Sequence, residues 1–175
     1  LFWWFEYWLK GEGLMPELHV QMQRNDGRWH VEDTWPPEDM YWEEITLDQA
    51  TATGSTVSAT SSVTITIPAS ENDRFISGLP TLHLSASTGF CDGGQVFATM
   101  FDASEDLRLG HATMDVRYRD GGYEAKTVTP FTTYNMQMEF NPMDVIVPAG
   151  HEIRIELTEN GMDYLPSPCA AIGMQ

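Results

Sequence analysis

The chain has 175 residues, 42% of them hydrophobic, and its 26 acidic and nine basic side chains give a formal net charge of −17. This length and hydrophobic content predict one domain with a buried core and argue against wholesale disorder. The acidic charge argues against nucleic acid as a partner, and no apolar run is long enough for a membrane span. We therefore expect a soluble protein, cytoplasmic rather than secreted, whose acidity would suit a saline environment.

The first eleven residues, LFWWFEYWLKG, predict a helix that is apolar on nearly every side. Six of the first eight residues are aromatic, and the polar Glu6 and Lys10 share one face at i, i+4. Each large ring carries roughly 150–250 Å² of surface that a soluble monomer rarely leaves exposed. The segment therefore needs a packing partner beyond its own length. The start on Leu1 rather than Met also suggests an excised piece.

From residue 18 onward the pattern is one of short strands and turns. Residues 18–23 and 28–33 alternate around Asp26-Gly27, which predicts a hairpin. A strand is expected at 41–47. The hydroxyl-rich residues 48–62 could form a flexible connection or an exposed edge, and we favour the connection. Further alternating stretches lie at 63–70, 75–79, 82–88, 94–103, 109–119, 136–148 and 150–158. About ten strands behind one short N-terminal helix predict an all-β fold, an antiparallel β-sandwich or jelly roll.

No sequence motif for catalysis, cofactor binding or a metal is present. The G-x-S-x-G elbow, the P-loop, the dinucleotide fingerprint and H-E-x-x-H are all missing, so we assign no catalytic, cofactor-binding or metal-ligating residue. The histidines share no ligand spacing and are interpreted as surface or sheet-face residues (His19, His30, His83, His111 and His151). Loop carboxylates could bind calcium, although a solvated acidic face explains them equally well (Glu71, Asp73, Asp102, Glu105 and Asp106).

Two further sets of residues leave alternatives open. Cys91 and Cys169, the only cysteines, could form one disulfide across a long loop or stay buried as small apolar side chains. Trp29, Trp35 and Trp42, with Tyr41 nearby, could line a sugar-binding platform or pack in a core or interface. The three tryptophans are therefore candidate ligand-facing residues.

Four segments, in order along the chain, resemble one known family. WFEYWLKGEGLMPELHVQMQRNDGRWHVEDTWPP is similar to the stretch that joins the two main domains of X-Pro dipeptidyl-peptidases and cocaine-esterase-type acyl esterases. RFISGLPTLHLSAST, GQVFATMFDASEDLRLGHATMDVRYR and VIVPAGHEIRIELTENGMDYLP resemble later strands of that family. The chain departs from the family at 44–70, which lacks a Y-x-Y-D-P-x-x-P segment, and at Glu152, where Arg is usual.

The resemblance implies an accessory domain of a serine hydrolase. Residues 1–15 would be a linker helix from a missing α/β-hydrolase domain, and residues 16–175 a jelly roll like the galactose-binding domains. The family's catalytic Ser, Asp and His would lie in the missing domain, whose reaction is hydrolysis of X-Pro peptides or acyl esters. This non-catalytic domain would shape the cleft and stabilise domain or subunit contacts, with a homo-oligomer also compatible. The helix rings would pack on the hydrolase domain (Phe2, Trp3, Trp4, Phe5 and Trp8).

Two other functions stay open at this point. A stand-alone carbohydrate-binding module requires that some of Trp29, Trp35 and Trp42 are exposed and coplanar on one face. A free-standing hydrolase with an unrecognised site requires the chain itself to turn over ester or anilide substrates.

Overall fold

The computed structural model describes residues 2–15, 19–46, 50–161 and 171–174. A short helix opens the chain as α1 (Phe2–Phe5) and continues as the π-helix η1 (Glu6–Lys10), ending at Gly11 in the left-handed region. The strands are β1 (Val20–Gln23), β2 (Trp29–Glu32), β3 (Thr51–Thr53), β4 (Thr56–Ser58), β5 (Val63–Ile67), β6 (Arg74–Gly78), β7 (Thr81–Thr88), β8 (Gln95–Asp102), β9 (Leu107–Asp115), β10 (Thr133–Glu139), β11 (Met143–Val147), β12 (Ile153–Thr158) and β13 (Ala171–Met174). A 3₁₀ turn, η2 (Val116–Tyr118), follows β9. None of the described helices is long and apolar enough to cross a membrane.

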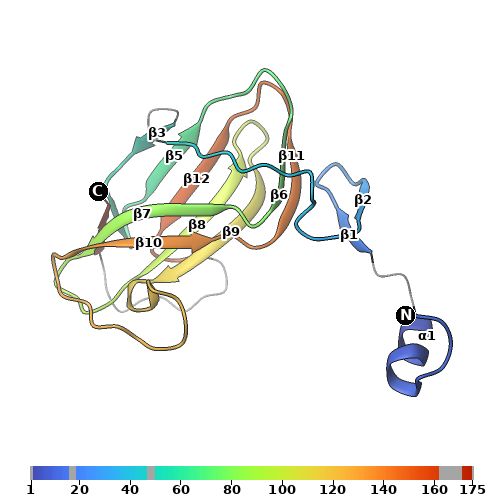
Figure 1. Ribbon diagram of the computed structural model, residues 1–175. Helices are drawn as coiled ribbons and strands as arrows, with labels where there is room; N and C mark the ends of the chain where they lie inside the picture. The colour runs from blue at the N-terminus through green and yellow to red at the C-terminus, as the bar shows by residue number, and fades with distance from the viewer. Residues whose placement is uncertain (1, 16–18, 47–49, 162–170, 175) are drawn as a thin grey trace.

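The strands form a two-layer antiparallel sandwich. One layer is the five-stranded sheet in the order β3-β5-β12-β8-β9. The other is the four-stranded sheet β10-β7-β13-β4, and β11 and β6 form a separate two-stranded sheet. Figure 1 shows β7 and β10 crossing over β8 and β9, so the two layers face each other. The structure therefore confirms the predicted all-β sandwich with one short N-terminal helix.

The core lies between the layers and follows from alternation along the strands. In the central strand β12, Ile153, Ile155 and Leu157 are buried, while the residues between them are half-buried. Met136 and Met138 of β10 are buried in the same alternating way. Because successive side chains of a strand point to opposite faces, each strand contributes one apolar face to the core.

The hairpin of β1 and β2 forms as the sequence predicts. Asp26-Gly27 makes the turn, with Gly27 at a φ of 81° and its N–H donating to the Arg24 carbonyl at 2.9 Å. The left-handed φ suits glycine because no Cβ is present to clash. The hairpin forms its own two-stranded sheet beside β11 and β6 (Figure 1).

Two predictions for residues 41–62 are wrong. No strand forms in the described part of 41–47, because Tyr41 to Glu44 are exposed and only Ile45 packs against the core. At 48–62 the favoured connection is wrong and the alternative, an edge, is what the structure contains: β3 and β4 pair with β5 and β13 as the outermost strands of their sheets. Threonine is common in strands, and the side chain of Val57 in β4 is fully buried in the core. These two features are compatible with edge strands made of small hydroxyl residues.

Candidate functional site

The N-terminal helix carries a surface of exposed rings. Phe2, Trp3, Trp4, Phe5 and Trp8 leave 44–74% of their surfaces open to solvent. They contact one another, as in the Trp4–Trp8 pair with ring centroids 6.3 Å apart. Figure 1 shows the helix lying apart from the strands of the sandwich, in agreement with the large exposed fractions of the rings. The helix therefore exposes aromatic side chains that are not covered within their own segment, as the sequence predicts.

The three tryptophans proposed to face a ligand lie in different settings. Trp29 is on β2 and 66% exposed, and Trp42 is in the extended segment after the Trp35-Pro36 turn and 76% exposed. Trp35 is half-buried. Their role as ligand-facing residues stays a prediction.

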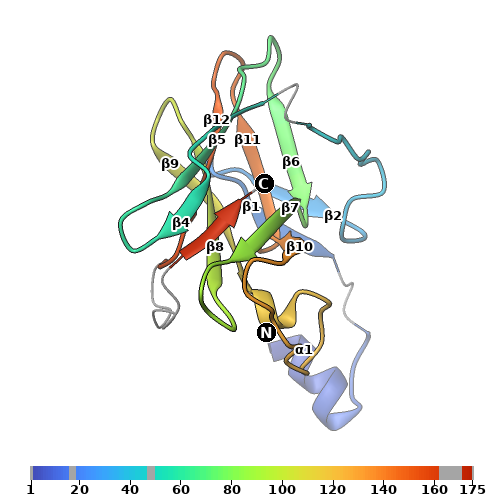
Figure 2. The ribbon, with the colours of Figure 1, turned by 90° about the vertical axis from the view of Figure 1, so that its left-hand side faces the viewer.

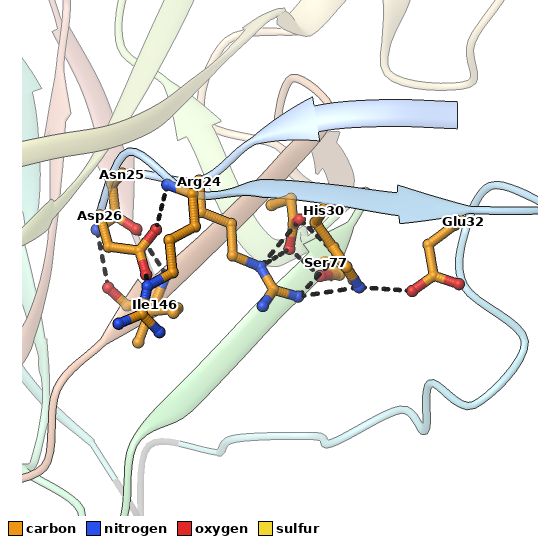
Figure 3. A network of polar contacts seen from close by, with 9 residues as sticks. Arg24, Asn25, Asp26, His30, Glu32, Ser77 and Ile146 are labelled. Carbon is orange, nitrogen blue, oxygen red and sulfur yellow. Dashed lines mark hydrogen bonds and ion pairs between the residues drawn. The ribbon is translucent and has the colours of Figure 1, made fainter. Parts of the chain in front are cut away.

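A buried carboxylate joins the hairpin to the sandwich. Asp144 of β11 has a fully buried side chain, and Arg24 Nε lies 3.0 Å from both of its oxygens. His30 Nδ1 of β2 lies 2.8 Å from Asp144 Oδ2, and Ser77 of β6 donates its hydroxyl to Asp144 Oδ1. The other ring nitrogen of His30 lies 2.6 Å from Glu32 Oε1. Figure 3 shows Arg24 and His30 reaching from the hairpin toward Ser77.

The electrostatic consequence is a stabilised anion. Burial by itself would raise the pKa of Asp144, but hydrogen bonds from Ser77, His30 and Arg24, together with the Arg24 charge, outweigh it and lower that pKa. A charge is tolerated in the interior only when it is paired and hydrogen-bonded in this way. This arrangement connects the β1–β2 hairpin to β6 and β11.

A second buried acid lies at the start of the β8–β9 turn. Asp102 Oδ2 lies 2.8 Å from His151 Nδ1, and Asp102 Oδ1 accepts the Ser104 N–H at 3.0 Å. Asp102 is only 1% exposed, so describing it as part of a solvated acidic face was wrong. The pair fixes the turn between β8 and β9 against the loop before β12.

The remaining candidate ligands do not come together. His83 lies on β7 and His111 on β9, in different sheets, and His19 pairs with Asp33 at 3.1 Å. Glu71, Asp73, Glu105 and Asp106 are exposed. Across the part of the chain that the structure describes, no group of three or more His, Cys, Asp or Glu side chains is placed to hold a metal ion.

Cys91 takes part in a disulfide bond, which decides one of the alternatives that the sequence left open for it. Cys169 lies outside the described residues. The disulfide follows directly after β7, where the Thr88 hydroxyl also donates to the Cys91 carbonyl at 2.9 Å.

Comparison with known families decides the assignment. Residues 46–166 match the model of the X-Pro dipeptidyl-peptidase C-terminal non-catalytic domain. The chain belongs to this family. It is therefore the non-catalytic C-terminal domain of a protein in the X-Pro dipeptidyl-peptidase group, and the match does not favour a stand-alone carbohydrate-binding module.

Individual relatives agree with the family assignment. A Bacillus anthracis protein named as a Xaa-Pro dipeptidyl-peptidase is 23% identical over 95% of this chain. A crystal structure of an aminopeptidase from a marine sediment Thaumarchaeota archaeon aligns over 98% of the chain with 14% identity and a TM-score of 0.65. A CocE/NonD family hydrolase from Staphylococcus aureus aligns over 98% with 11% identity and a TM-score of 0.64. At these identities the two structures show the shared fold.

The chain is much shorter than these relatives. It spans 33% of the Bacillus anthracis protein. It spans 40% of the archaeal aminopeptidase chain and 42% of the Staphylococcus aureus hydrolase chain. The aligned portions of the two solved structures cover nearly all of this chain.

The buried ion network escaped the sequence analysis, although one signal for it exists. Asp144 interrupts the otherwise apolar stretch Met143 to Val147 at a buried position. A carboxylate at such a position needs a cation, and the chain has few. Searching the arginines for its partner would have pointed to the hairpin.

Proposed function

We propose that this domain packs, through the aromatic helix, on the α/β-hydrolase domain of a parent serine hydrolase that cleaves X-Pro peptides or acyl esters. In that role residues 1–15 form the link to the catalytic domain and residues 16–175 form the jelly roll. The parent's reaction proceeds through a serine acyl-enzyme, and its Ser, Asp and His belong to the other domain.

The exposed helix is the observation that carries the proposal. At their observed exposures the five rings leave roughly 400–700 Å² of aromatic surface open to water, which equals or exceeds the largest apolar patch of a typical soluble monomer. Contact with a second folded domain would remove that surface from water at about 25 cal/mol per Å². Membership of a family described as C-terminal and non-catalytic supports a catalytic domain of the same protein as that partner.

The domain contributes to the parent's activity by forming one side of the active-site cleft and stabilising it. A rigid β-sandwich supports loops at its ends, and such loops are where binding contacts collect. The ion network of Asp144 supports this role because it fixes the hairpin, which follows the helix along the chain, to the sandwich. A homo-oligomer formed through the same domain stays a prediction.

The reading frame upstream of Leu1 tests the proposal directly. We expect several hundred preceding codons that encode G-x-S-x-G followed by a catalytic Asp and His. The protein expressed from the whole reading frame should hydrolyse an Ala-Pro p-nitroanilide or a p-nitrophenyl ester. A start codon immediately before Leu1 would contradict the proposal, and the aromatic helix would then require a separate partner chain.

A further inference from the structure

The position after β12 carries a buried carboxylate where the strand pattern predicts an apolar side chain. Ile153, Ile155 and Leu157 alternate into the core, and Glu159 continues the same two-residue period. Glu159 is 6% exposed, and its Oε2 atom is buried without a hydrogen-bond partner among the described residues. Removing a carboxylate oxygen from water without supplying a donor is unfavourable. The carboxylate of Glu159 therefore requires a partner that the described part of the fold does not provide.

The other buried carboxylates of the described chain have such partners. Arg24 lies against Asp144, and His151 lies against Asp102, each within hydrogen-bond distance. Glu159 shares their burial but lacks their partners. This difference sets Glu159 apart from the structural acids of the sandwich.

Glu159 lines a pocket between two connections of the sandwich. The pocket has a volume of about 340 Å³ and lies between the β4–β5 turn and the end of β12. Because β4 belongs to the four-stranded sheet and β12 to the five-stranded sheet, residues of both layers line the pocket (Figure 2). Apart from one alanine, the described residues that line it are polar (Ser58, Ala59, Thr60, Ser61, Ser62, Thr158, Glu159 and Asn160).

Hydrogen bonds within these two connections fix the walls of the pocket. The Ser58 N–H donates to the Ser61 carbonyl at 2.9 Å, and the Ser61 N–H donates to the Ser58 carbonyl at 3.2 Å. The Thr60 N–H donates to Ser58 Oγ at 3.3 Å. On the opposite wall, the Thr158 hydroxyl donates to the Asn160 carbonyl at 2.9 Å. Because the chain itself orders both walls, a ligand would bind without first ordering them.

The composition of the pocket indicates the charge of its ligand. The described residues that line it include no Lys, Arg or His, so no side chain there balances an anion. Glu159 is the single acidic residue among them, and one carboxylate offsets one positive charge. Calcium sites commonly combine several carboxylates, which this pocket does not offer among its described residues. The pocket therefore suits a ligand with one positive charge.

The size and hydrogen-bonding groups of the pocket indicate what carries that charge. A volume of about 340 Å³ lies at the lower end of the range for small-molecule pockets and far exceeds the volume of a bare ion. A primary ammonium has three N–H donors and no acceptor. One carboxylate surrounded by hydroxyl oxygens supplies both the counter-charge and the acceptors that such a group needs.

We propose that this pocket binds a small organic molecule through its protonated primary amine, with Glu159 as the counter-ion. The hydroxyl groups of the β4–β5 turn accept the remaining N–H groups of the ammonium. The net charge of −17 attracts cations to the surface of the chain and favours their encounter with the pocket. The inference goes beyond the proposed function and does not depend on a catalytic domain, because every group that it uses lies in this chain.

Titration of the 175-residue chain with n-butylammonium chloride at pH 7, followed by the NMR shifts of backbone amides, tests the site. We expect saturable shifts centred on residues 58–62 and 158–160, with a dissociation constant of about 1 mM. The alcohol 1-butanol has the same carbon chain without the charge and should give no saturable shift.

Two variants test the role of the carboxylate. Glu159→Gln keeps the size of the side chain and removes its charge, so it should weaken amine binding at least about tenfold. The control Glu152→Gln removes an exposed carboxylate just before β12 and should leave the dissociation constant unchanged.

Four results would overturn the inference. Shifts that do not saturate with the amine would show that the pocket binds no ammonium. Equal binding of 1-butanol would show that the charge is not recognised, and undiminished binding to folded Glu159→Gln would show that this carboxylate is not the counter-ion. Calcium chloride that gives the same shifts at a lower concentration than the amine would identify a metal site. The comparison of amine and alcohol uses the unaltered chain, so it decides the matter even where Glu159→Gln does not fold.

Discussion

At the scale of single residues, the buried Asp144 anion has the clearest energetic role. Replacing it by Asn removes the charge that Arg24 and His30 face. Loss of a charged buried hydrogen-bond partner costs about 1–3 kcal/mol. We therefore expect Asp144→Asn to lower the free energy of unfolding of the chain by about that amount at pH 7, measured by urea denaturation. The exposed carboxylate variant Asp33→Asn is the control and should change it little.

The same residue makes stability depend on pH in a defined direction. The pKa of Asp144 is lowered by folding, so its contribution is present above the unfolded pKa of about 3.9 and is lost as pH falls through the folded pKa. The difference between wild type and Asp144→Asn should therefore shrink below about pH 4. A difference that stays constant from pH 7 to pH 3 would mean that the charge is not what stabilises the site.

Phe131 provides a second residue-scale prediction. Glycine tolerates the φ of 61° at this position, whereas alanine keeps the steric cost of a Cβ. Both substitutions remove the exposed ring. We therefore expect the Phe131→Gly chain to be about 1 kcal/mol more stable than the Phe131→Ala chain in urea unfolding. Equal stability of the two variants would show that the backbone at this position is not strained.

At the scale of elements, the hairpin depends on contacts that a sequence pattern does not reveal. The side chain of Asn25 donates to the Ile146 carbonyl and accepts the Ile146 N–H, both at 2.8 Å. Asn25→Ala should increase the hydrogen-exchange rates of β1 and β2 amides by about tenfold, because the hairpin would open from the sandwich more often. Gln23→Ala removes only a bond to Gly27 within the hairpin and should leave those rates nearly unchanged.

Most of the strands, but not the contacts between distant elements, could be predicted from the sequence. Alternation of apolar and polar residues predicted most strands of the sandwich, because each strand has one apolar face. The same alternation around the Asp26-Gly27 turn predicted the hairpin. For Thr51–Thr53 and Thr56–Ser58 the sequence left a connection or an edge open, and the connection was wrongly favoured because edge strands of small hydroxyl residues resemble a connection. The Asp144 network joins residues 120 positions apart, and no local pattern encodes such a pairing.

At the scale of the whole molecule, the aromatic helix should matter only when the catalytic domain is present. Trp4 and Trp8 are exposed in this chain, so replacing both by Ser should leave its thermal midpoint nearly unchanged. In the protein from the whole reading frame the same change removes interdomain burial and should lower the midpoint by a few degrees. Glu6→Gln on the polar face is the control. An equal shift in both proteins would mean that the rings stabilise this domain itself.

We infer that this domain is non-catalytic and serves a hydrolase encoded in the same frame. The most direct test compares turnover of an Ala-Pro p-nitroanilide and a p-nitrophenyl ester by the purified 175-residue chain and by the whole-frame protein. We expect turnover by the whole-frame protein and none above buffer by the chain alone. Turnover by the chain alone, unchanged on further purification, would contradict it and would require an active site within these residues.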